Sequence, residues 1–392
     1  MNASSKMTAL VYLLAFMGSI GNPIVLPALP FMMEELDITP MQMGMMISMY
    51  ALPGACILPF YGMLSDRLGR RAMLLGSLAL CVAGSLLCVF APGFSTLIAG
   101  RALQGLSITP LDAMSFTLVT DLFEGVERVK HVQRCSTVQF FAVTAVPVAL
   151  ACLIPVLGWR AGFMLAALIS ALSLILSYPV RFSYQPHTAQ GLRLFLSHLG
   201  HVLASWRMLL LFAVRILVAV MIFGVIYPHL PLLMVQKLGF APEQVGIMFS
   251  IYALGMFLGS LLLPLLAKRL STGMIGITGS VFLSSAVAYL AFASQLWHIG
   301  AGLLCVGMGS GVLIPRNTAY VSLCATEDTH GSVMSAYSTI FRLGQALAPG
   351  LMGMIYALGS FGALFSSAAV LALVTGAVSC AAFVAADRKA RL

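Results

Sequence analysis

The chain has 392 residues, of which 60% are hydrophobic and only 8% are charged, and its formal net charge is +9. A soluble globular domain carries about 25% charged residues, so this composition excludes a chain whose whole surface faces water. At about 20 apolar residues per membrane span, the length accommodates roughly twelve helices joined by short loops. The sequence therefore predicts an all-α protein embedded in a bilayer, with no room for a nucleic-acid-binding domain.

Twelve apolar segments follow one another along the chain, separated by charged or turn-rich breaks. They cover residues 8–33, 41–62, 72–91, 95–119, 135–157, 161–180, 207–234, 243–266, 274–293, 297–320, 332–357 and 361–385. The first segment follows a single basic residue, Lys6, and is too long for the core of a signal peptide. No small-residue cleavage site follows it, so we expect all twelve segments to be transmembrane helices.

The basic residues are distributed unevenly between the two sides of the predicted membrane. Of the 21 Lys and Arg residues, 15 fall on one side, four fall within spans, and only Arg160 and Lys237 fall on the other side. Because cytoplasmic loops carry an excess of Lys and Arg, this asymmetry predicts that both termini are cytoplasmic. The eight Cys residues lack disulfide or metal-ligand spacing, so we expect them to act as small apolar residues.

The second half of the chain repeats the first. Residues 26–71 align with residues 227–273 after one inserted residue, and the motif Ser-x-Tyr-Ala-Leu recurs at 48–52 and 250–254. Both copies enter the membrane from the same side. The repeat therefore predicts parallel halves, related by an axis along the membrane normal.

Each half is expected to form a bundle of six helices. The N-terminal bundle would comprise residues 1–181 and the C-terminal bundle residues 207–392, with residues 182–206 as a cytoplasmic linker. Later in the two halves, the repeat pairs Pro110 with Pro315.

A stretch rich in Gly, Asp and Arg separates the second and third apolar segments. It reads Gly-Met-Leu-Ser-Asp-Arg-Leu-Gly-Arg-Arg at residues 62–71, and it must lie in water because lipid cannot satisfy its charges. Two further motifs are Arg-x-x-Gln-Gly at residues 101–105 and Gly-Trp-Arg-x-x-Phe at residues 158–163. With twelve spans in parallel halves, this chain resembles the major facilitator superfamily, and most of all its twelve-helix drug/proton antiporters.

The resemblance covers essentially the whole chain and implies a secondary active transporter that needs no cofactor. Two features depart from the antiporter pattern. Only Pro147 remains of a glycine-rich signature in the fifth span, and Gly21-Asn22-Pro23 stands where many relatives have an acidic residue in the first span. The resemblance therefore supplies no proton carrier on the first helix.

Asp112, in the fourth span, is the one carboxylate well inside a predicted span. A charged side chain costs about 2.5–3.5 kcal/mol to insert on translocon-based scales, so Asp112 must face a cavity or a partner. Burial favours its protonated form, and a nearby Arg favours its ionised form. We therefore expect Asp112 to couple transport to protons, with a permanent Asp–Arg pair as the alternative. The resemblance adds Arg101 to the proton-coupling residues, and Arg101 is also expected to bond the bends of neighbouring helices.

Three further Arg residues lie within spans of the second half. Arg215 and Arg316 are expected to approach a central cavity and to favour an anionic or zwitterionic substrate through bidentate contacts. Snorkelling of Arg316 to the inner surface, or structural pairing of the whole set, is the alternative interpretation. Arg342 is expected to brace the eleventh helix. The remaining expected cavity residues are polar or aromatic: Asn22, Gln139, Tyr227, Tyr252 and Asn317, with His229 next in line.

The stretch at residues 62–71 is also expected to be a conformational latch. The resemblance implies that the Asp caps the start of the eleventh helix, near Gly331, where the helix dipole favours a negative charge. It also implies that the Arg residues pair with an acidic residue at the end of the fourth helix. The expected latch residues are Gly62, Asp66, Arg67, Gly69, Arg70, Arg71 and Asp121.

The sequence thus predicts a monomeric transporter in a bacterial inner (plasma) membrane. It would exchange protons for a small amphipathic or anionic compound by alternating access, most simply in the direction of export. Proton-coupled import of an anionic nutrient is an alternative, because the fold runs in either direction. No nucleophile–base arrangement, metal motif or Walker motif occurs in the sequence, so neither an enzyme nor an ATP-driven pump is expected.

Copper transport is a further alternative, because thioethers suit Cu(I). Methionines crowd the expected outer ends of the first two spans, and one His and one Met of the second half could add ligands. These residues are Met32, Met33, Met41, Met43, Met45, Met46, Met49, His229 and Met234.

Overall fold

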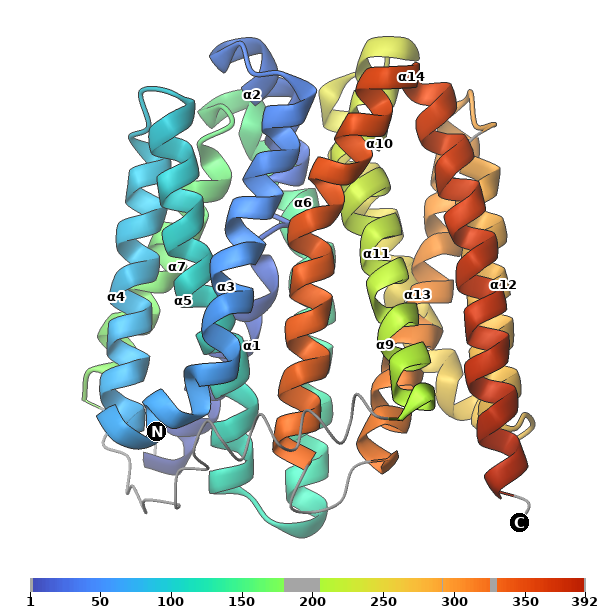
Figure 1. Cartoon of the computed structure of the whole chain (residues 1–392). Helices are drawn as coiled ribbons and strands as arrows, with labels where there is room; N and C mark the ends of the chain where they lie inside the picture. Colours follow the sequence, from blue (N-terminus) through green and yellow to red (C-terminus); the bar gives the residue numbers. More distant parts are fainter. Residues whose placement is uncertain (1–2, 180–204, 291, 325–329, 391–392) are drawn as a thin grey trace. The chain divides into compact units, whose positions relative to one another are not determined.

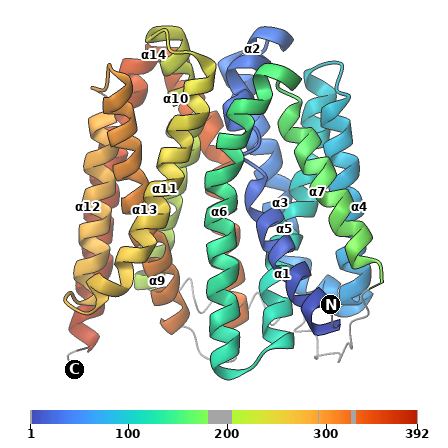
Figure 2. The ribbon, with the colours of Figure 1, turned by 180° about the vertical axis from the view of Figure 1, so that it is seen from behind.

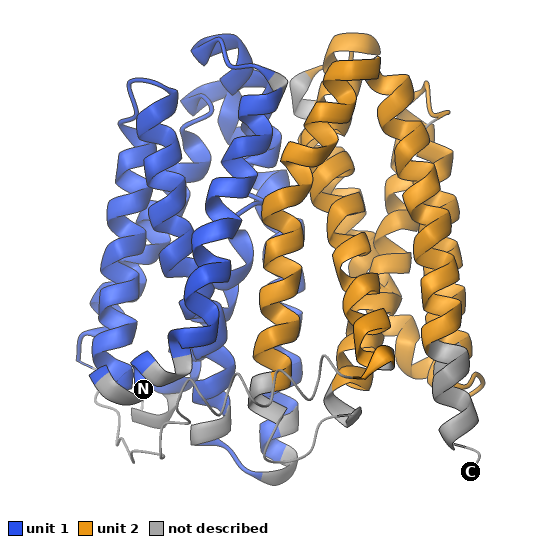
Figure 3. Cartoon of the chain, in the orientation of Figure 1, with its two compact units in different colours: residues 1–191 blue, residues 192–392 orange. Residues whose placement is uncertain are grey.

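In the computed structural model, the described residues are 3–179, 205–290, 292–324 and 330–390, and their regular structure is entirely helical. The chain divides into two compact units, residues 1–191 and 192–392, which Figure 3 colours separately. The expected linker, residues 182–206, lies almost wholly outside the described residues.

Unit 1 contains eight helical elements within its described residues (Figure 1). They are α1 (Ala3–Ile20), the 3-10 turn η1 (Leu26–Ala28), α2 (Leu29–Leu36), α3 (Pro40–Leu68), α4 (Arg70–Val89), α5 (Phe94–Leu122), α6 (Gly125–Leu157) and α7 (Ala161–Ser177). The first expected span is therefore not one helix, because the α-helix stops at Ile20 and resumes at Leu29. Pro23 and Pro27 lack the N–H that a continuing helix would need.

The helix α5 is the centre of unit 1. It packs against α1, α3, α4 and α6, and the views from both sides show it enclosed by these helices (Figures 1 and 2). Small residues allow the close approach: a methyl group at Gly105 would overlap the carbonyl of Tyr50 on α3, and one at Gly100 would overlap Cys88 on α4. This packing brings the polar side chains of α5 within reach of α1 and α3.

Unit 2 contains eight helical elements within its described residues. They are α9 (Trp206–Ala219), the π-helical segment η2 (Val220–Ile226), α10 (Tyr227–Leu232), the π-helical segment η3 (Leu233–Lys237), α11 (Pro242–Ala267), α12 (Thr272–Leu290), α13 (Leu296–Cys324) and α14 (His330–Ala390). At 61 residues, α14 would be about 90 Å long if it were straight, three times the thickness of a bilayer core. Instead its ribbon rises, reverses and descends (Figures 1 and 2), so α14 contains both of the last two expected spans.

The internal repeat is visible in the contacts of each unit. A methyl group at Gly307 of α13 would overlap the carbonyl of Tyr252, just as one at Gly105 would overlap that of Tyr50, and both pairs differ by 202 in number. The starts of α3 and α11 also match, because the Gln side chain at the third helical position accepts a backbone N–H in both: from Thr39 at 2.7 Å and from Ala241 at 2.9 Å. The halves therefore share one packing plan.

These contacts also fix the register of the later helices. Both α5 and α13 run without interruption past their glycines, so Pro110 corresponds to Val312 and Asp112 to Ile314. The pairing of Pro110 with Pro315, taken from the sequence, therefore differs from this alignment by three residues.

Seven of the described helical segments are long and apolar enough to cross a membrane, and three shorter apolar helices accompany them. The other two expected spans lie in α5, which carries several charges, and in the first half of α14. The exposed side chains of unit 2 are largely apolar, such as Leu358 and Leu373, as expected for helices surrounded by lipid.

Candidate functional site

Arg101 on α5 is completely buried and holds the break in the first span. Its Nη1 donates to the carbonyl of Gly21 at 2.9 Å and to Oε1 of Gln104 at 2.8 Å, and its Nη2 donates to Oδ1 of Asn22 at 3.1 Å. Its Nε donates to the carbonyl of Met46 at 3.3 Å. The guanidinium also lies over the Tyr50 ring, 4.5 Å from its centre. Arg101 thus bonds the break in the first span and one carbonyl of the neighbouring helix α3.

This arrangement follows from the broken backbone of the first span. A carbonyl in an intact helix accepts the N–H four residues later, but the chain leaves the α-helix at Ile20, which allows the carbonyl of Gly21 to face Arg101. Gly21 also has no room for a side chain, because a methyl group there would overlap the Tyr50 hydroxyl. Since the amide oxygen of Asn22 is bound to Arg101, Asn22 acts in this structure as part of the scaffold.

Asp112 lies three turns further along α5, where α1 and α6 meet it. Its Oδ1 accepts a hydrogen bond from Nε2 of Gln139 on α6, at 2.7 Å. On the α1 side, a methyl group placed on Gly18 would come within 2.7 Å of the Asp112 carboxylate. Eleven helical residues separate Asp112 from Arg101, about 16 Å along the axis. The donors of Arg101 therefore serve the helix break, and the structure brings Asp112 together with Gln139.

In unit 2, Arg215 on α9 lies against aromatic rings of α14. Its guanidinium carbon is 3.9 Å from the centre of the Phe341 ring and 5.1 Å from that of Tyr337. Its Nε and Nη1 have no hydrogen-bond partner among the described residues. Both of these donors are buried, so Arg215 holds two unsatisfied nitrogen donors beneath the aromatic rings.

A row of aromatic rings leads from Arg215 along the π-helical segment. Phe341 contacts Phe223 (5.7 Å between ring centres), Phe223 contacts Tyr227 (4.9 Å), and Tyr227 contacts Tyr252 on α11 (6.1 Å). The wider turn of η2 accompanies this row, and π-helical segments are frequent at functional sites. The structure thereby links three residues expected at the cavity, Arg215, Tyr227 and Tyr252.

Asn317, Arg316 and Arg342 lie in the same unit. The buried Asn317 on α13 donates to the carbonyl of Leu211 on α9 at 3.3 Å, one turn before Arg215, so it fixes α13 to α9. Arg316 precedes it and is half-buried. Arg342 is also half-buried and follows Phe341 on α14, next to the ring that covers Arg215.

His229 and the outer methionines lie in different units, and each is described by its own surroundings. Nδ1 of His229 lies 2.8 Å from the carbonyl of Gly224, which can only accept, so Nδ1 carries the proton. Among the outer methionines, Met32, Met43 and Met46 are fully buried, whereas Met41 and Met45 are exposed.

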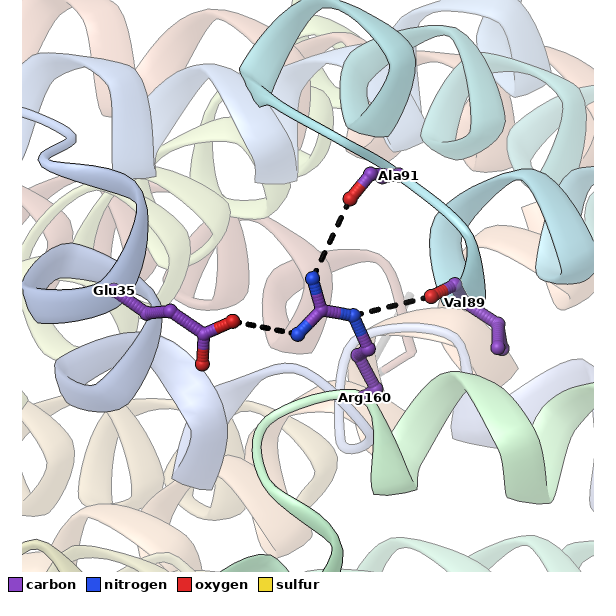
Figure 4. Close-up of polar contacts among 4 residues, drawn as sticks. All are labelled: Glu35, Val89, Ala91 and Arg160. Atoms are coloured by element: carbon purple, nitrogen blue, oxygen red, sulfur yellow. Dashed lines mark hydrogen bonds and ion pairs between the residues drawn. The ribbon is translucent and has the colours of Figure 1, made fainter.

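Arg160, from the Gly-Trp-Arg motif, ties together three elements of unit 1 (Figure 4). Its Nη1 forms an ion pair with Oε1 of Glu35 at 2.6 Å, and its Nε and Nη2 donate to the carbonyls of Val89 and Ala91 at 3.2 and 3.5 Å. The hydrogen bond from Arg160 holds the pKa of Glu35 below its ordinary value. The motif therefore connects the end of α2, the end of α4 and the start of α7.

The latch motif is described in part. Gly69 joins α3 to α4 with φ of 84°, a left-handed conformation that favours glycine. Arg71 donates from Nη2 to the carbonyl of Tyr178 at the end of α7, at 2.7 Å, where the helix dipole favours a cation. Arg70 is half-buried at the first position of α4. For Gly62, Asp66, Arg67, Asp121 and Gly331 the structure describes the helical backbone alone, so their expected latch contacts stay predictions.

Several residues of these clusters were not singled out from the sequence. Gly18 and Ser85 belong to unit 1, where Ser85 accepts a hydrogen bond from Gln104 at 2.9 Å. Phe223, Phe341 and Tyr337 build the aromatic row and the face of Arg215. A small residue or a phenylalanine inside an apolar span gives no local signal, because such spans consist of these residues throughout.

The fold and these clusters agree with the comparison to known families. A model of the Major Facilitator Superfamily matches residues 9–233 and 212–391, so the chain belongs to this superfamily. It is therefore a multi-pass membrane protein of a class that transports small molecules.

Within the superfamily, the chain is similar to proteins named for drug resistance. It is 27% identical to the chloramphenicol resistance protein CraA of Acinetobacter baumannii over 82% of this chain and 79% of CraA. It is 26% identical to the class B tetracycline resistance protein of Escherichia coli over 91% of this chain and 89% of that protein. Its fold is similar to the crystal structure of the nucleoside transporter NupG, with a TM-score of 0.82 at 11% identity, over 96% of this chain and all of that one.

Proposed function

We propose that this chain is a proton-coupled exporter of small amphipathic or anionic compounds. It would work by alternating access, as a monomer in a bacterial inner membrane, with twelve spans and both termini in the cytoplasm. Similarity to two drug-resistance proteins supports the direction of transport. The basic residues of the sequence support the orientation.

The hydrogen bond between Asp112 and Gln139 is the observation that most supports the proposal of proton coupling. A primary amide can donate through Nε2 to a carboxylate, and it can accept through Oε1 from a carboxylic acid. Gln139 can therefore satisfy Asp112 in both protonation states by turning its amide. A guanidinium has no acceptor and favours only the ionised state. The Gln139 partner thus suits a carboxylate that gains and loses a proton in each cycle.

The donors of Arg215 support an anionic or polarised substrate. They lie beside the row formed by Phe341, Phe223 and Tyr227, so a compound with an aromatic or apolar body and a polar end could contact both features. Chloramphenicol and tetracycline are suitable first compounds, because the similar proteins are named for resistance to them.

The decisive experiment uses purified protein in liposomes with an imposed pH gradient. Export of chloramphenicol and tetracycline and the accompanying proton flux would be measured for the wild type, Asp112→Asn and Gln139→Leu. We expect Asp112→Asn to abolish gradient-driven accumulation while it still exchanges substrate across the membrane. Gln139→Leu should slow transport by about tenfold, since one hydrogen bond to a charged group is worth about 1.5–3 kcal/mol.

The matched control is Asp37→Asn. Asp37 is exposed, has φ of 49° and follows α2, and Asn tolerates that conformation, so this variant should transport like the wild type. Gradient-driven export by Asp112→Asn at the wild-type rate would refute proton coupling through this residue. If the substrate instead accumulates on the side that corresponds to the cytoplasm, the result would favour the importer. Saturable uptake of Cu(I) would favour the copper transporter.

A further inference from the structure

A groove of about 550 Å³ opens between three elements of unit 2: η3, the loop between α12 and α13, and the second half of α14. These elements lie side by side at one end of the unit (Figures 1 and 2). We name it the Lys237 groove after its one charged lining residue. The lining residues that matter here are Lys237, Phe292, Ser294, Phe361, Phe365 and Ser366.

The polar groups of the groove are donors without partners. Lys237, Ser294 and Ser366 are exposed, and their side chains make no hydrogen bond or ion pair with any other described residue. No Asp or Glu side chain is among the lining residues. An ammonium group and two hydroxyl groups around one opening suit the oxygens of a phosphate, which accepts from all three.

The rest of the groove and its surroundings are apolar. Phe292 is 85% exposed at the rim, and the exposed side chains of Val370 and Leu373 continue along α14 away from Lys237. Trp297 and Tyr289, next to the α12–α13 loop, are 65% and 42% exposed. Exposed Trp and Tyr concentrate at the level of lipid headgroups, so the groove has its cationic end at headgroup depth and its apolar side toward acyl chains.

We propose that the Lys237 groove binds an anionic phospholipid. The phosphate would accept from Lys237, Ser294 and Ser366, and an acyl chain would lie over Phe292 and along α14. A soluble anion would use the polar groups but would leave the phenylalanines in water, so the combination favours a lipid. The site is separate from Asp112 and Arg215, and it depends on membrane insertion alone, not on the proposed export or proton coupling.

The test measures lipid binding by purified protein. Phosphatidylglycerol would be titrated into detergent-solubilised protein, with native mass spectrometry and thermal unfolding as readouts, and phosphatidylcholine would be the neutral comparison. The variants are Lys237→Gln, which removes the cation, and Gly362→Leu, which fills the groove. A Cβ atom added at Gly362 meets no atom within 4 Å, so the backbone there leaves room for a side chain. The controls are Lys268→Gln, an exposed Lys after α11, and Gly76→Leu on α4, where an added side chain also meets no atom within 4 Å.

We expect Lys237→Gln to weaken phosphatidylglycerol binding by about fivefold, since one Lys near an anionic surface is worth about 1 kcal/mol. Gly362→Leu should also weaken binding, because its side chain occupies the groove. Both controls should bind like the wild type. Equal binding of phosphatidylcholine, or wild-type affinity in both groove variants, would overturn the proposal. Competition by glycerol phosphate at the same concentration as the lipid would also overturn it and would indicate a soluble-anion site. Transport is assayed on the same variants. Because Asp112 is unaltered in them, a loss of lipid binding can be separated from a failure of the proposed proton coupling.

Discussion

Arg101 of unit 1 and Arg215 of unit 2 are both guanidinium groups inside predicted spans, but the protein stabilises them in different ways. Arg101 is fully buried and makes four hydrogen bonds, two of them to backbone carbonyls. Arg215 lies against two aromatic rings and keeps two nitrogen donors without a partner. The first arrangement is complete without a ligand, and the second leaves donors available to one.

The backbone explains the difference. In unit 1 the first span breaks after Ile20, so the carbonyl of Gly21 can face a donor. In unit 2 the corresponding span continues through the π-helical segments η2 and η3, and residues 220–234 are all buried. With the offset of 202 residues between the halves, the residue that corresponds to Arg101 is Leu303, whose apolar side chain needs no hydrogen-bond acceptor. Two halves with one packing plan therefore stabilise their Arg residues differently, with hydrogen bonds in one and aromatic contacts in the other.

The largest expected effect comes from Arg101→Leu. It removes four hydrogen bonds and leaves the amides of Asn22 and Gln104 without their buried donor. Each buried acceptor left without a donor costs about 1–3 kcal/mol, so the midpoint of thermal unfolding in detergent should fall by many degrees. Transport should be lost together with stability.

Arg215→Leu is the comparison variant. Two of its nitrogen donors contribute no hydrogen bond in this state and mainly its aromatic contacts are lost, so the unfolding midpoint should fall by less than in Arg101→Leu while transport of an anionic compound falls. Equal losses of stability in the two variants would contradict the division between a structural Arg and a ligand-facing Arg.

The shared packing plan can be tested at two glycines. Gly105→Ala and Gly307→Ala each place a methyl group against a backbone carbonyl, of Tyr50 and Tyr252 respectively, so the helices must move apart. Overpacking of this kind costs about 1–3 kcal/mol, and both variants should lower the unfolding midpoint by similar amounts. Gly76→Ala is the control, because a methyl group there meets no atom within 4 Å. Tolerance of one substitution but not the other would show that the two contacts are not equivalent.

The sequence predicts much of this architecture, because hydropathy and the repeat act over long stretches of chain. The membrane-protein class, the superfamily and the matching starts of α3 and α11 all follow from patterns of many residues. The break in the first span also has a sequence signal, Gly21-Asn22-Pro23, but the interpretation as one span missed its consequence. The length of apolar sequence limits a span, and it does not show whether the helix inside it is continuous.

The candidate site is harder to predict, because it depends on which faces of the helices meet. Asp112 and Gln139 were both expected at the cavity, yet only the packing of α5 on α6 shows that they are bonded to each other. The alignment of α13 with α5 from their prolines is wrong by three residues, because a proline marks a bend and a bend can shift along a helix by a turn. The contacts of Gly105 and Gly307 are a better guide, since close backbone approach requires a small residue at one position.

The aromatic face of Arg215 provides a smaller and sharper test. Phe341→Leu removes the ring 3.9 Å from the guanidinium, and a desolvated cation–π contact is worth about 1–2 kcal/mol. In a double-mutant cycle with Arg215→Met, the two losses of stability should therefore be non-additive by about 1 kcal/mol. Phe249→Leu is the control, because Phe249 contacts Tyr227 and not Arg215, so it should be additive with Arg215→Met. Additivity of Phe341→Leu would contradict the cation–π contact.

The smallest expected effect is at Glu35, the exposed partner of Arg160. Half of the Glu35 side chain is exposed, so Glu35→Gln should cost less than about 1 kcal/mol at neutral pH. The hydrogen bond from Arg160 lowers the pKa of Glu35 in the folded state below its ordinary value of 4.5. The stabilisation is therefore fully present above pH 4.5 and is lost as the pH falls through the lower folded-state value. The unfolding midpoint of the wild type should exceed that of Glu35→Gln at pH 7 and converge with it in acid, measured at low salt, where screening is weakest. A difference that stays constant down to pH 3 would mean that packing of the Glu35 side chain, and not its charge, connects α2 to Arg160.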